Sequence, residues 1–245
     1  MELKEDILCL AQDEVARSCQ WYDSYEETEG LRILSLDLIP ALKEEGYIFK
    51  CRIASGTVLM RNPFRKKEFI DIANPDCEEL IINSKMGAID KIAQELGAKH
   101  ISGNAVFLEE TKLTRETDGN IKTTKVSADL AYKKEQEEQY AKKYKLNRDY
   151  LGVFSEKSYR VAKKLLKEYN LESDYEISDL VEMRNPNKIN TLCRQQVHME
   201  VYQEINSCKD IAFSLSAMNI VDMGLQTKAS IETRKRIVFE SEIEF

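Results

Sequence analysis

The last quarter of the chain, residues 194–245, alternates apolar and polar side chains in one phase for an unusual distance. Successive side chains of a β-strand point to opposite faces, whereas a helix loses a two-residue phase within two turns. Most even positions are polar, and the apolar residues at odd positions are Val197, Met199, Val201, Ile205, Ile211, Phe213, Leu215, Ala217, Met223, Leu225, Ala229, Ile231, Ile237, Phe239, Ile243 and Phe245. The pattern therefore predicts extended backbone with one buried face.

This stretch is too long for one ordinary strand. Strands in globular proteins average about five or six residues, whereas residues 223–245 as a single strand would reach roughly 75 Å. We predict a short turn at 219–224 that joins two long strands. A bend or break is expected near 232–235, where polar residues follow one another. The two strands form a ribbon whose apolar face must be covered by another part of the chain.

The middle of the chain repeats this design. Residues 100–113 and 121–133 flank residues 116–120, which contain the Asp-Gly pair typical of hairpin turns. We expect the two ribbons to share one sheet, because each has a single continuous apolar side to bury.

Other segments carry helical patterns. The best marked is 74–97, where Asn74 can cap the helix, Pro75 suits its first position and Gly97 can end it. Further segments are assigned by their apolar spacing. Helices are predicted at 3–19, 134–145, 155–169 and 178–184, and short strands at 31–39, 46–54, 57–60 and 68–72.

The order of these elements predicts the α+β class. We expect a mostly antiparallel sheet built from two long β-hairpins, with helices packed on one face and an acidic helix at the N-terminus. Proline and glycine number only four and nine, so no flexible linker stands out. Residues 1–30 are predicted to form an acidic helical arm, and residues 31–245 a single α+β domain.

Composition and charge narrow the function classes. The 245 residues are 42% hydrophobic and 32% charged, which is typical of a soluble protein with a core. Residues 1–30 hold two bases and nine acids, a difference of −7 that equals the net charge of the whole chain. Without a basic surplus, nucleic acid is not an expected partner. Six cysteines without a CxxC pair, and no recognisable signal sequence, predict reduced thiols and a cytoplasmic location.

Residues 61–67 form the one notable basic cluster, at an expected loop between strands. The members that we predict to contact an anionic surface are Arg61, Phe64, Arg65, Lys66 and Lys67. Such a loop can contact phosphates, so an anionic membrane is a candidate partner, and a solvated loop is the common alternative. We also hypothesise that the acidic arm docks near this loop and covers it.

No strong catalytic motif is present: the chain lacks the GxSxG, GxxxxGK[ST] and GxGxxG patterns. A metal-dependent nuclease needs carboxylates and a lysine at adjacent strand ends, for which the chain offers Asp76 and the Glu-Thr-Lys of 110–112. The commoner explanations are that Asp76 is a capping acid at the start of a helix and that residues 110–112 form a solvated strand end.

The two histidines of the chain, His100 and His198, both begin predicted strands. If those strands are neighbours, the imidazoles could bind a metal with Cys193 or Glu200. Surface histidines on a sheet are commoner. We therefore assign no metal ligand, no cofactor and no catalytic residue, and we favour a non-catalytic protein.

The alternating segments also suit a membrane, because strands that span a bilayer alternate over about ten residues. Long amphipathic hairpins joined by helical layers resemble the layout of pore-forming proteins of the gasdermin or perforin-like kind. In those families a soluble monomer refolds its hairpins into an oligomeric pore. The resemblance is one of layout and assigns no residues.

Our leading expectation is a non-catalytic protein that acts by self-assembly or by binding another protein, because long ribbons present strand edges that recruit other strands. The alternatives are a pore-forming protein that is soluble until triggered, and a metal-dependent nuclease or other enzyme with an unrecognised site.

Overall fold

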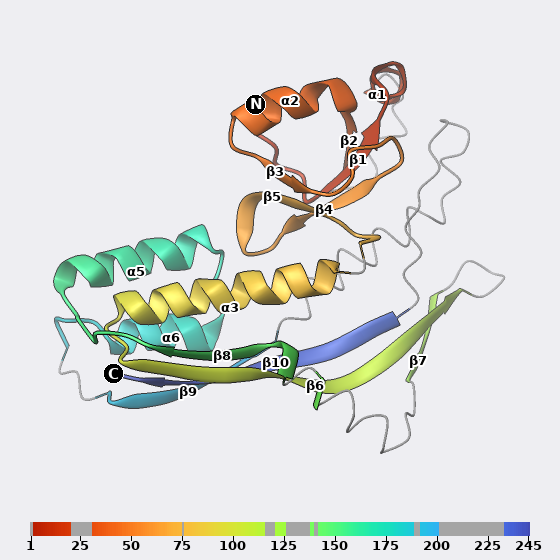
Figure 1. The fold of residues 1–245 in the computed structure, drawn as a ribbon. Coiled ribbons are helices and arrows are strands. Elements are labelled where there is room, and N and C mark those ends of the chain that lie inside the picture. The colour runs from red at the N-terminus through yellow and green to blue at the C-terminus, as the bar shows by residue number, and fades with distance from the viewer. Residues whose placement is uncertain are drawn as a thin grey trace. The chain divides into compact units, whose positions relative to one another are not determined.

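A computed structural model provides the fold of the chain (Figure 1). The structure describes residues 2–20, 31–74, 76–115, 121–125, 138–139, 142–188, 192–200 and 233–245. These residues form an α+β fold with five α-helices and two β-sheets. They fall into two compact units, residues 2–79 and residues 80–200 with 233–245. Residues 2–20 and 31–79 both belong to the first unit.

The first unit contains sheet A, which mixes parallel and antiparallel pairs. Its order is β2-β1-β4-β5-β3, where β1–β2 and β3–β5 are parallel and β1–β4 and β4–β5 are antiparallel. A second, mixed sheet was not expected from the sequence. The strands are β1 Ile7–Ala11, β2 Leu31–Ser35, β3 Ile48–Lys50, β4 Val58–Asn62 and β5 Arg65–Asp71.

The helix predicted for residues 3–19 is wrong over its first half. Residues 7–11 form β1, whose five side chains are all buried, and the helix α1 covers only Asp13–Gln20. Apolar residues at the start of the chain fit a helical stripe and a short buried strand equally well. The unbroken apolar run Ile-Leu-Cys-Leu-Ala suits a strand that is covered on both faces, as a strand with a parallel neighbour usually is.

The predicted strand at 31–39 ends early. After β2, a single 3₁₀ turn (η2, Leu36–Leu38) leads into α2, Ile39–Glu44, and Pro40 stands at the start of this helix. Proline is favoured there because its missing N–H has no helical partner to lose. The core of the unit is built from residues of sheet A and α2, with Leu3 before β1 and Tyr47 before β3. Its buried members are Leu3, Leu8, Leu10, Leu34, Ile39, Leu42, Tyr47, Leu59 and Phe69.

The second unit contains sheet B, in which every pair is antiparallel. Its order is β7-β6-β10-β9, with β8 paired to the first part of β6. Strands from the middle and from the end of the chain therefore share one sheet. The turn predicted at 219–224 lies outside the described residues, as do residues 126–133 and 201–232. The strands are β6 His100–Arg115, β7 Ile121–Lys125, β8 Lys145–Asp149, β9 Arg194–Glu200 and β10 Thr233–Glu244.

One face of sheet B is apolar and buried, as the alternation predicted for its described part. Ser241, on this face, is also buried. His198 and Glu240, at even positions of β9 and β10, point to the opposite, exposed face of the sheet. The buried apolar side chains at odd positions are Ile101, Ala105, Val197, Phe239 and Ile243.

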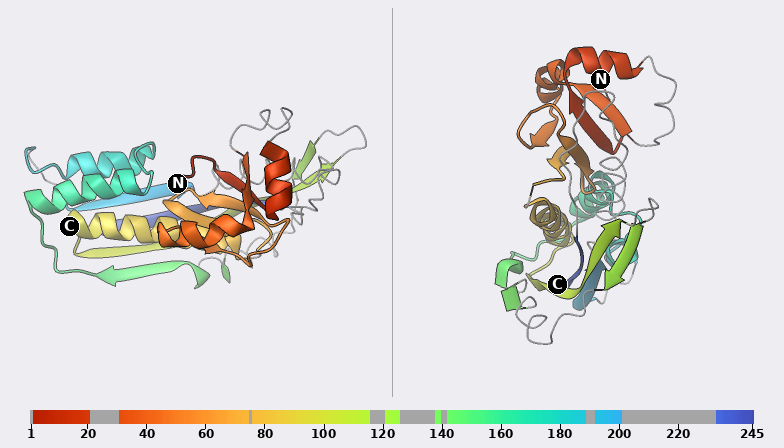
Figure 2. Two further views of the ribbon diagram at one scale, coloured as in Figure 1. Left: turned by 90° about the horizontal axis from the view of Figure 1, so that it is seen from above. Right: turned by 90° about the vertical axis from the view of Figure 1, so that its right-hand side faces the viewer.

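Three helices lie on the same side of sheet B (Figure 1 and Figure 2). They are α3 Cys77–Glu95, α5 Glu156–Glu168 and α6 Tyr175–Met183, each close to its predicted position. Ser155 caps α5 by accepting a hydrogen bond from the Ser158 N–H. Gly97 follows α3 with φ +81°, the left-handed conformation that favours glycine.

Strand β8 was not predicted, because residues 134–145 carry a helical charge pattern and residues 145–149 have no apolar alternation. The strand exists because its backbone pairs with the first part of β6, with Asn104 opposite Lys145 and His100 opposite Asp149. Pairing of this kind depends on a partner that lies 41 or more residues away in the sequence.

Candidate functional site

The predicted anionic-contact residues lie together on the β4–β5 hairpin of the first unit. Arg61 belongs to β4 and Phe64 lies in the turn. Arg65, Lys66 and Lys67 begin β5. The five side chains nevertheless have very different surroundings.

Arg61 is held by the N-terminal residues of the chain. Its Nη2 donates to the carbonyl oxygens of Leu3 (3.0 Å) and Glu5 (2.6 Å), and its Nε donates to Asp6 Oδ1 (3.0 Å). Its guanidinium also stacks on the ring of Phe69, 4.8 Å from the centroid. This arginine therefore joins residues 3–6 to β4, and it is not a free cation for a partner.

Phe64 is 2% exposed and faces the interior, so the aromatic member of the cluster is not at the surface. The turn around it is held by buried polar groups. Asn62 Nδ2 donates to Glu68 Oε1 (2.7 Å), and Asn62 Oδ1 accepts from the Phe64 N–H (3.0 Å). Arg65 Nη1 donates to the other carboxylate oxygen of Glu68 (3.3 Å). These contacts set the shape of the turn.

Arg65, Lys66 and Lys67 are the exposed cations of the cluster, and Arg65 pairs with Glu68. Lys67 Nζ donates to the Glu45 carbonyl oxygen (2.7 Å) and lies 5.3 Å from the centroid of the Tyr47 ring. Contact of this hairpin with an anionic surface stays a prediction, which now rests on Lys66 and Lys67 and on the half-exposed Arg65.

The two histidines do not meet. His100 is on β6 and His198 on β9, and β10 runs between these strands. His100 Nδ1 lies 2.7 Å from Asp149 Oδ1, whereas His198 Nδ1 lies 3.9 Å from Glu176 Oε2. Among the described residues, no three potential metal-ligating side chains of the His, Cys, Asp and Glu types come together.

The residues considered for a nuclease have ordinary backbone roles. The Asp76 N–H donates to Asn74 Oδ1 (2.9 Å) just before α3 begins, as the predicted Asn cap requires. Residues 110–112 belong to β6, and their side chains lie outside the described part.

Cys51 is a poor candidate nucleophile, because burial and the nearby Asp71 carboxylate raise the pKa of its thiol to about 11.

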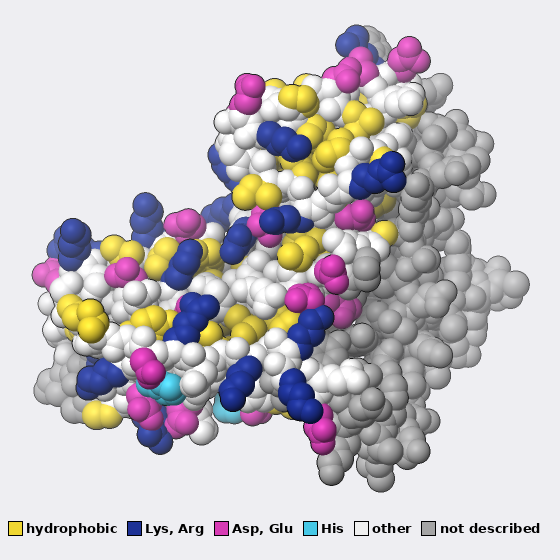
Figure 3. Space-filling model, in the orientation of Figure 1, with side chains coloured by type: hydrophobic (Ala, Val, Ile, Leu, Met, Phe, Trp, Pro, Cys, Tyr) yellow, Lys and Arg dark blue, Asp and Glu magenta, His cyan; other side chains and the backbone are white. Residues whose placement is uncertain are grey.

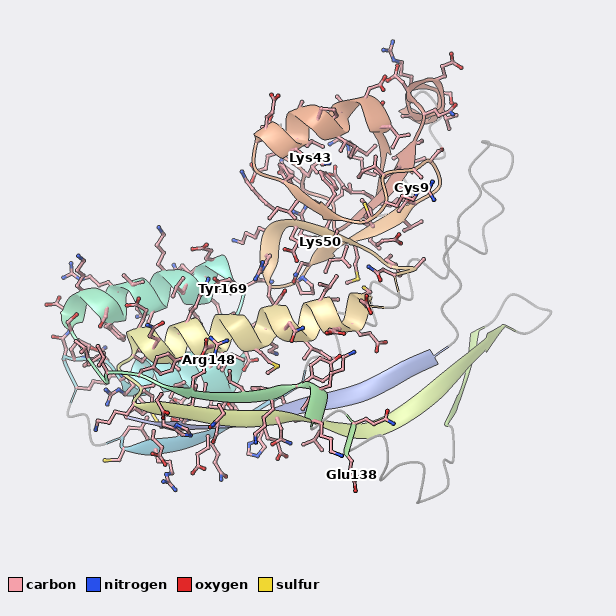
Figure 4. All side chains as sticks on the ribbon, viewed as in Figure 1. Cys9, Lys43, Lys50, Glu138, Arg148 and Tyr169 are labelled. Carbon is pink, nitrogen blue, oxygen red and sulfur yellow. The ribbon has the colours of Figure 1, made fainter. Side chains whose placement is uncertain are left out.

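The exposed face of sheet B holds an open depression of about 680 Å³. Glu138 lies on this side, opposite α3 (Figure 4). The lining mixes both signs of charge, so it has no single-sign field to attract an ionic substrate. The charged residues that line it are Glu138, Lys142, Lys145, Glu240 and Glu242, with His198 beside them.

A polar cluster around the buried Asp90 links α3 to β8 and to Tyr150 just after it, and the sequence patterns gave no signal for it. Asp90 on α3 is 5% exposed and accepts hydrogen bonds from Arg148 Nη1 and from the Tyr150 hydroxyl. Figure 4 shows Arg148 between β8 and α3. Burial, together with the hydrogen bond and the negative charge of Asp90, raises the pKa of Tyr150 to about 12.

This raised pKa predicts a loss of stability in alkali. The ordinary tyrosine pKa is 10.0 and the folded value is about 12. The stabilisation of the folded state by the protonated Tyr150 hydroxyl is therefore complete below pH 10 and is lost as the pH rises towards 12. In urea titrations across this range, the unfolding free energy of Tyr150→Phe should fall less than that of the wild type. Equal pH dependence in the two proteins would contradict the role of this hydroxyl.

No helix within the described residues is both long enough and apolar enough to cross a bilayer.

Comparison with known proteins assigns no family and no function to the chain. No protein-family model, curated protein or solved structure matches it.

Proposed function

We propose that this protein acts without catalysis, by self-assembly or by binding another protein, through the strands of its long antiparallel hairpins. The observation that carries the proposal is the outer edge of β9. Among the described residues, β9 is the last strand of sheet B on that side. Strand edges are surfaces to which another strand can add.

The direction of the backbone groups along β9 supports this. The Phe245 N–H donates to the Cys193 carbonyl oxygen (2.9 Å), so odd residues of β9 point their backbone groups towards β10. Gln196 and His198 therefore point theirs outward. The His198 N–H donates to the Glu176 carboxylate of α6. An added strand would displace this carboxylate and bond to the same N–H.

Proline at two neighbouring positions tests the proposal. Gln196→Pro removes an outward N–H, which sheet B does not use, whereas Gln195→Pro removes an inward one. We expect the wild type to self-associate and Gln196→Pro to weaken association about tenfold at unchanged melting temperature. Gln195→Pro should lower the melting temperature. Sedimentation equilibrium over a range of concentrations provides the measurement. A wild type that stays monomeric, or an unaffected Gln196→Pro, contradicts self-assembly at this edge.

A pore-forming activity is the second candidate. In its favour, β6 has 16 residues and β10 has 12, more than the about ten that a tilted strand needs to cross a bilayer. The β6–β7 hairpin also extends past the ends of α3, α5 and α6 (Figure 1). Dye release from liposomes tests this candidate, with Lys66→Gln/Lys67→Gln as the variant that probes the basic hairpin. Intact liposomes at high protein concentration, with and without limited proteolysis, contradict it.

A further inference from the structure

The loop between β8 and α5 exposes two large aliphatic side chains. Leu151 is 94% exposed and Val153 is 69% exposed. Such exposure is notable when the backbone is well anchored, because an aliphatic side chain is more stable when it is buried. The loop therefore keeps these apolar side chains in water, which is unfavourable in free energy. A partner that buried them would remove this unfavourable exposure.

Both ends of this loop are anchored. The Tyr150 N–H donates to the Lys99 carbonyl oxygen (2.8 Å), and Ser155 caps α5 at the other end. Gly152 between the two aliphatic residues has φ +68°, and a Cβ there would lie 2.6 Å from Lys99 Cγ. Lys99 thus packs against the loop backbone, and the aliphatic side chains face outward from a defined support.

Helix α5 follows this loop directly in the sequence and has a basic outward face. It contains five cations and two acids, and its inner face buries Tyr159, Ala162 and Leu166. Lys157 and Lys164 lie on the outward face with Val161, which is 36% exposed, between them. Figure 3 shows Lys and Arg side chains over α5 with hydrophobic side chains among them.

The other cations of α5 have carboxylate partners. Arg160 pairs with Glu156 (2.5 Å), and Lys163 pairs with Glu182 (2.8 Å). Lys167 lies 3.8 Å from Glu172. Within the described part of the chain, Lys157 and Lys164 make no ion pair, so their charge is available to a partner.

We propose that this surface, formed by Leu151, Val153, Lys157, Val161 and Lys164, binds an anionic phospholipid bilayer. The aliphatic side chains enter the boundary between head groups and acyl chains, and the lysines contact lipid phosphates. Lysine favours lipid over protein as the partner, because it is depleted at protein interfaces and its flexible stem lets the ammonium stay at the head groups. This site is separate from the strand edge of β9 and does not depend on self-assembly.

Co-sedimentation with vesicles tests the proposal. Wild-type protein should bind vesicles of phosphatidylcholine with phosphatidylserine and should not bind vesicles of phosphatidylcholine alone. Lys157→Gln and Lys164→Gln should each lower the partition coefficient about fivefold. Leu151→Gln/Val153→Gln should lower it about tenfold or more. All four side chains are exposed, so the melting temperature should not change.

A matched variant separates this surface from general charge effects. Lys142→Gln/Lys145→Gln removes two exposed cations from the other face of sheet B. It should leave binding within twofold of the wild type, a limit that allows for long-range attraction. Lys66→Gln/Lys67→Gln tests the β4–β5 hairpin as the competing anionic contact. A loss of binding in that variant which the α5 variants do not show, or binding to heparin that vesicles do not compete, overturns the proposal.

A tryptophan reporter gives an independent measurement. Leu151→Trp places an indole on the loop, and its emission should shift to the blue when anionic vesicles are added. Tyr175→Trp is the control, because Tyr175 is 79% exposed but begins α6, beyond the far end of α5. Its emission should not shift. Failure of Leu151→Trp to shift while the protein is vesicle-bound shows that another surface binds, and overturns the proposal.

Discussion

Gly103→Val is expected to destabilise the second unit by about 3 kcal/mol or more. Gly103 lies on the helix-facing side of β6, opposite Ser241 of β10. A Cβ at this position would lie 2.6 Å from the Glu240 carbonyl oxygen, 2.9 Å from Phe239 Cζ and 2.9 Å from Ser241 Cβ. The backbone oxygen cannot move without breaking the β6–β10 ladder. Urea denaturation followed by circular dichroism provides the free energy.

The neighbouring Ser102→Val is the control for this substitution. Ser102 is on the opposite, polar face of the same strand, where a β-branched side chain suits the extended backbone. Its unfolding free energy should change by less than about 0.5 kcal/mol. Equal effects at both positions would mean that β6 is sensitive to valine as such, and that the close contact at Gly103 is not the cause.

Asp174→Asn is expected to cost about 3 kcal/mol. Lys85 of α3 is 3% exposed, and its Nζ lies 3.0 Å from Asp174 Oδ2 just before α6. Asparagine keeps the cap, in which the side-chain oxygen accepts from the Ile177 N–H (3.4 Å), but removes the negative charge beside a buried ammonium. Asp174→Ala also removes the cap, which adds about 1 kcal/mol.

Two further variants isolate the charge pair. Asp179→Asn changes another acid of α6 and should alter stability by no more than about 0.5 kcal/mol. Lys85→Met removes the buried charge and should cost less than Asp174→Asn, because no buried ammonium then loses the carboxylate beside it. If Asp174→Asn is as mild as Asp179→Asn, the ion pair does not stabilise this helix contact.

Elements with a local chemical signature were predictable. Helix α3 follows an Asn-Pro start and precedes a glycine, and α5 has a serine cap that the structure confirms. The described parts of β6, β9 and β10 follow the two-residue alternation. In each case the information lies within a few neighbouring residues, where capping, glycine conformation and side-chain periodicity act.

The surroundings of the candidate site residues were less predictable. The cluster at 61–67 is basic in the sequence, but Phe64 is buried and Arg61 binds residues 3–6, both through contacts with distant residues. The loop at 151–153 gave no sequence signal, since Leu-Gly-Val is equally consistent with a buried turn. Only the surrounding structure leaves Leu151 exposed.

The sequence by itself determined where the backbone is extended or helical over its strongly patterned stretches. It also determined that the fold mixes α-helices and β-sheet. Those properties follow from local sterics and from the period at which side chains repeat. The tertiary structure alone decided that residues 7–11 are a strand, that residues 145–149 join sheet B, and that two sheets form instead of one. The physical reason is that strands are stabilised by backbone bonds to a partner, and the partner's position is not encoded within the strand itself.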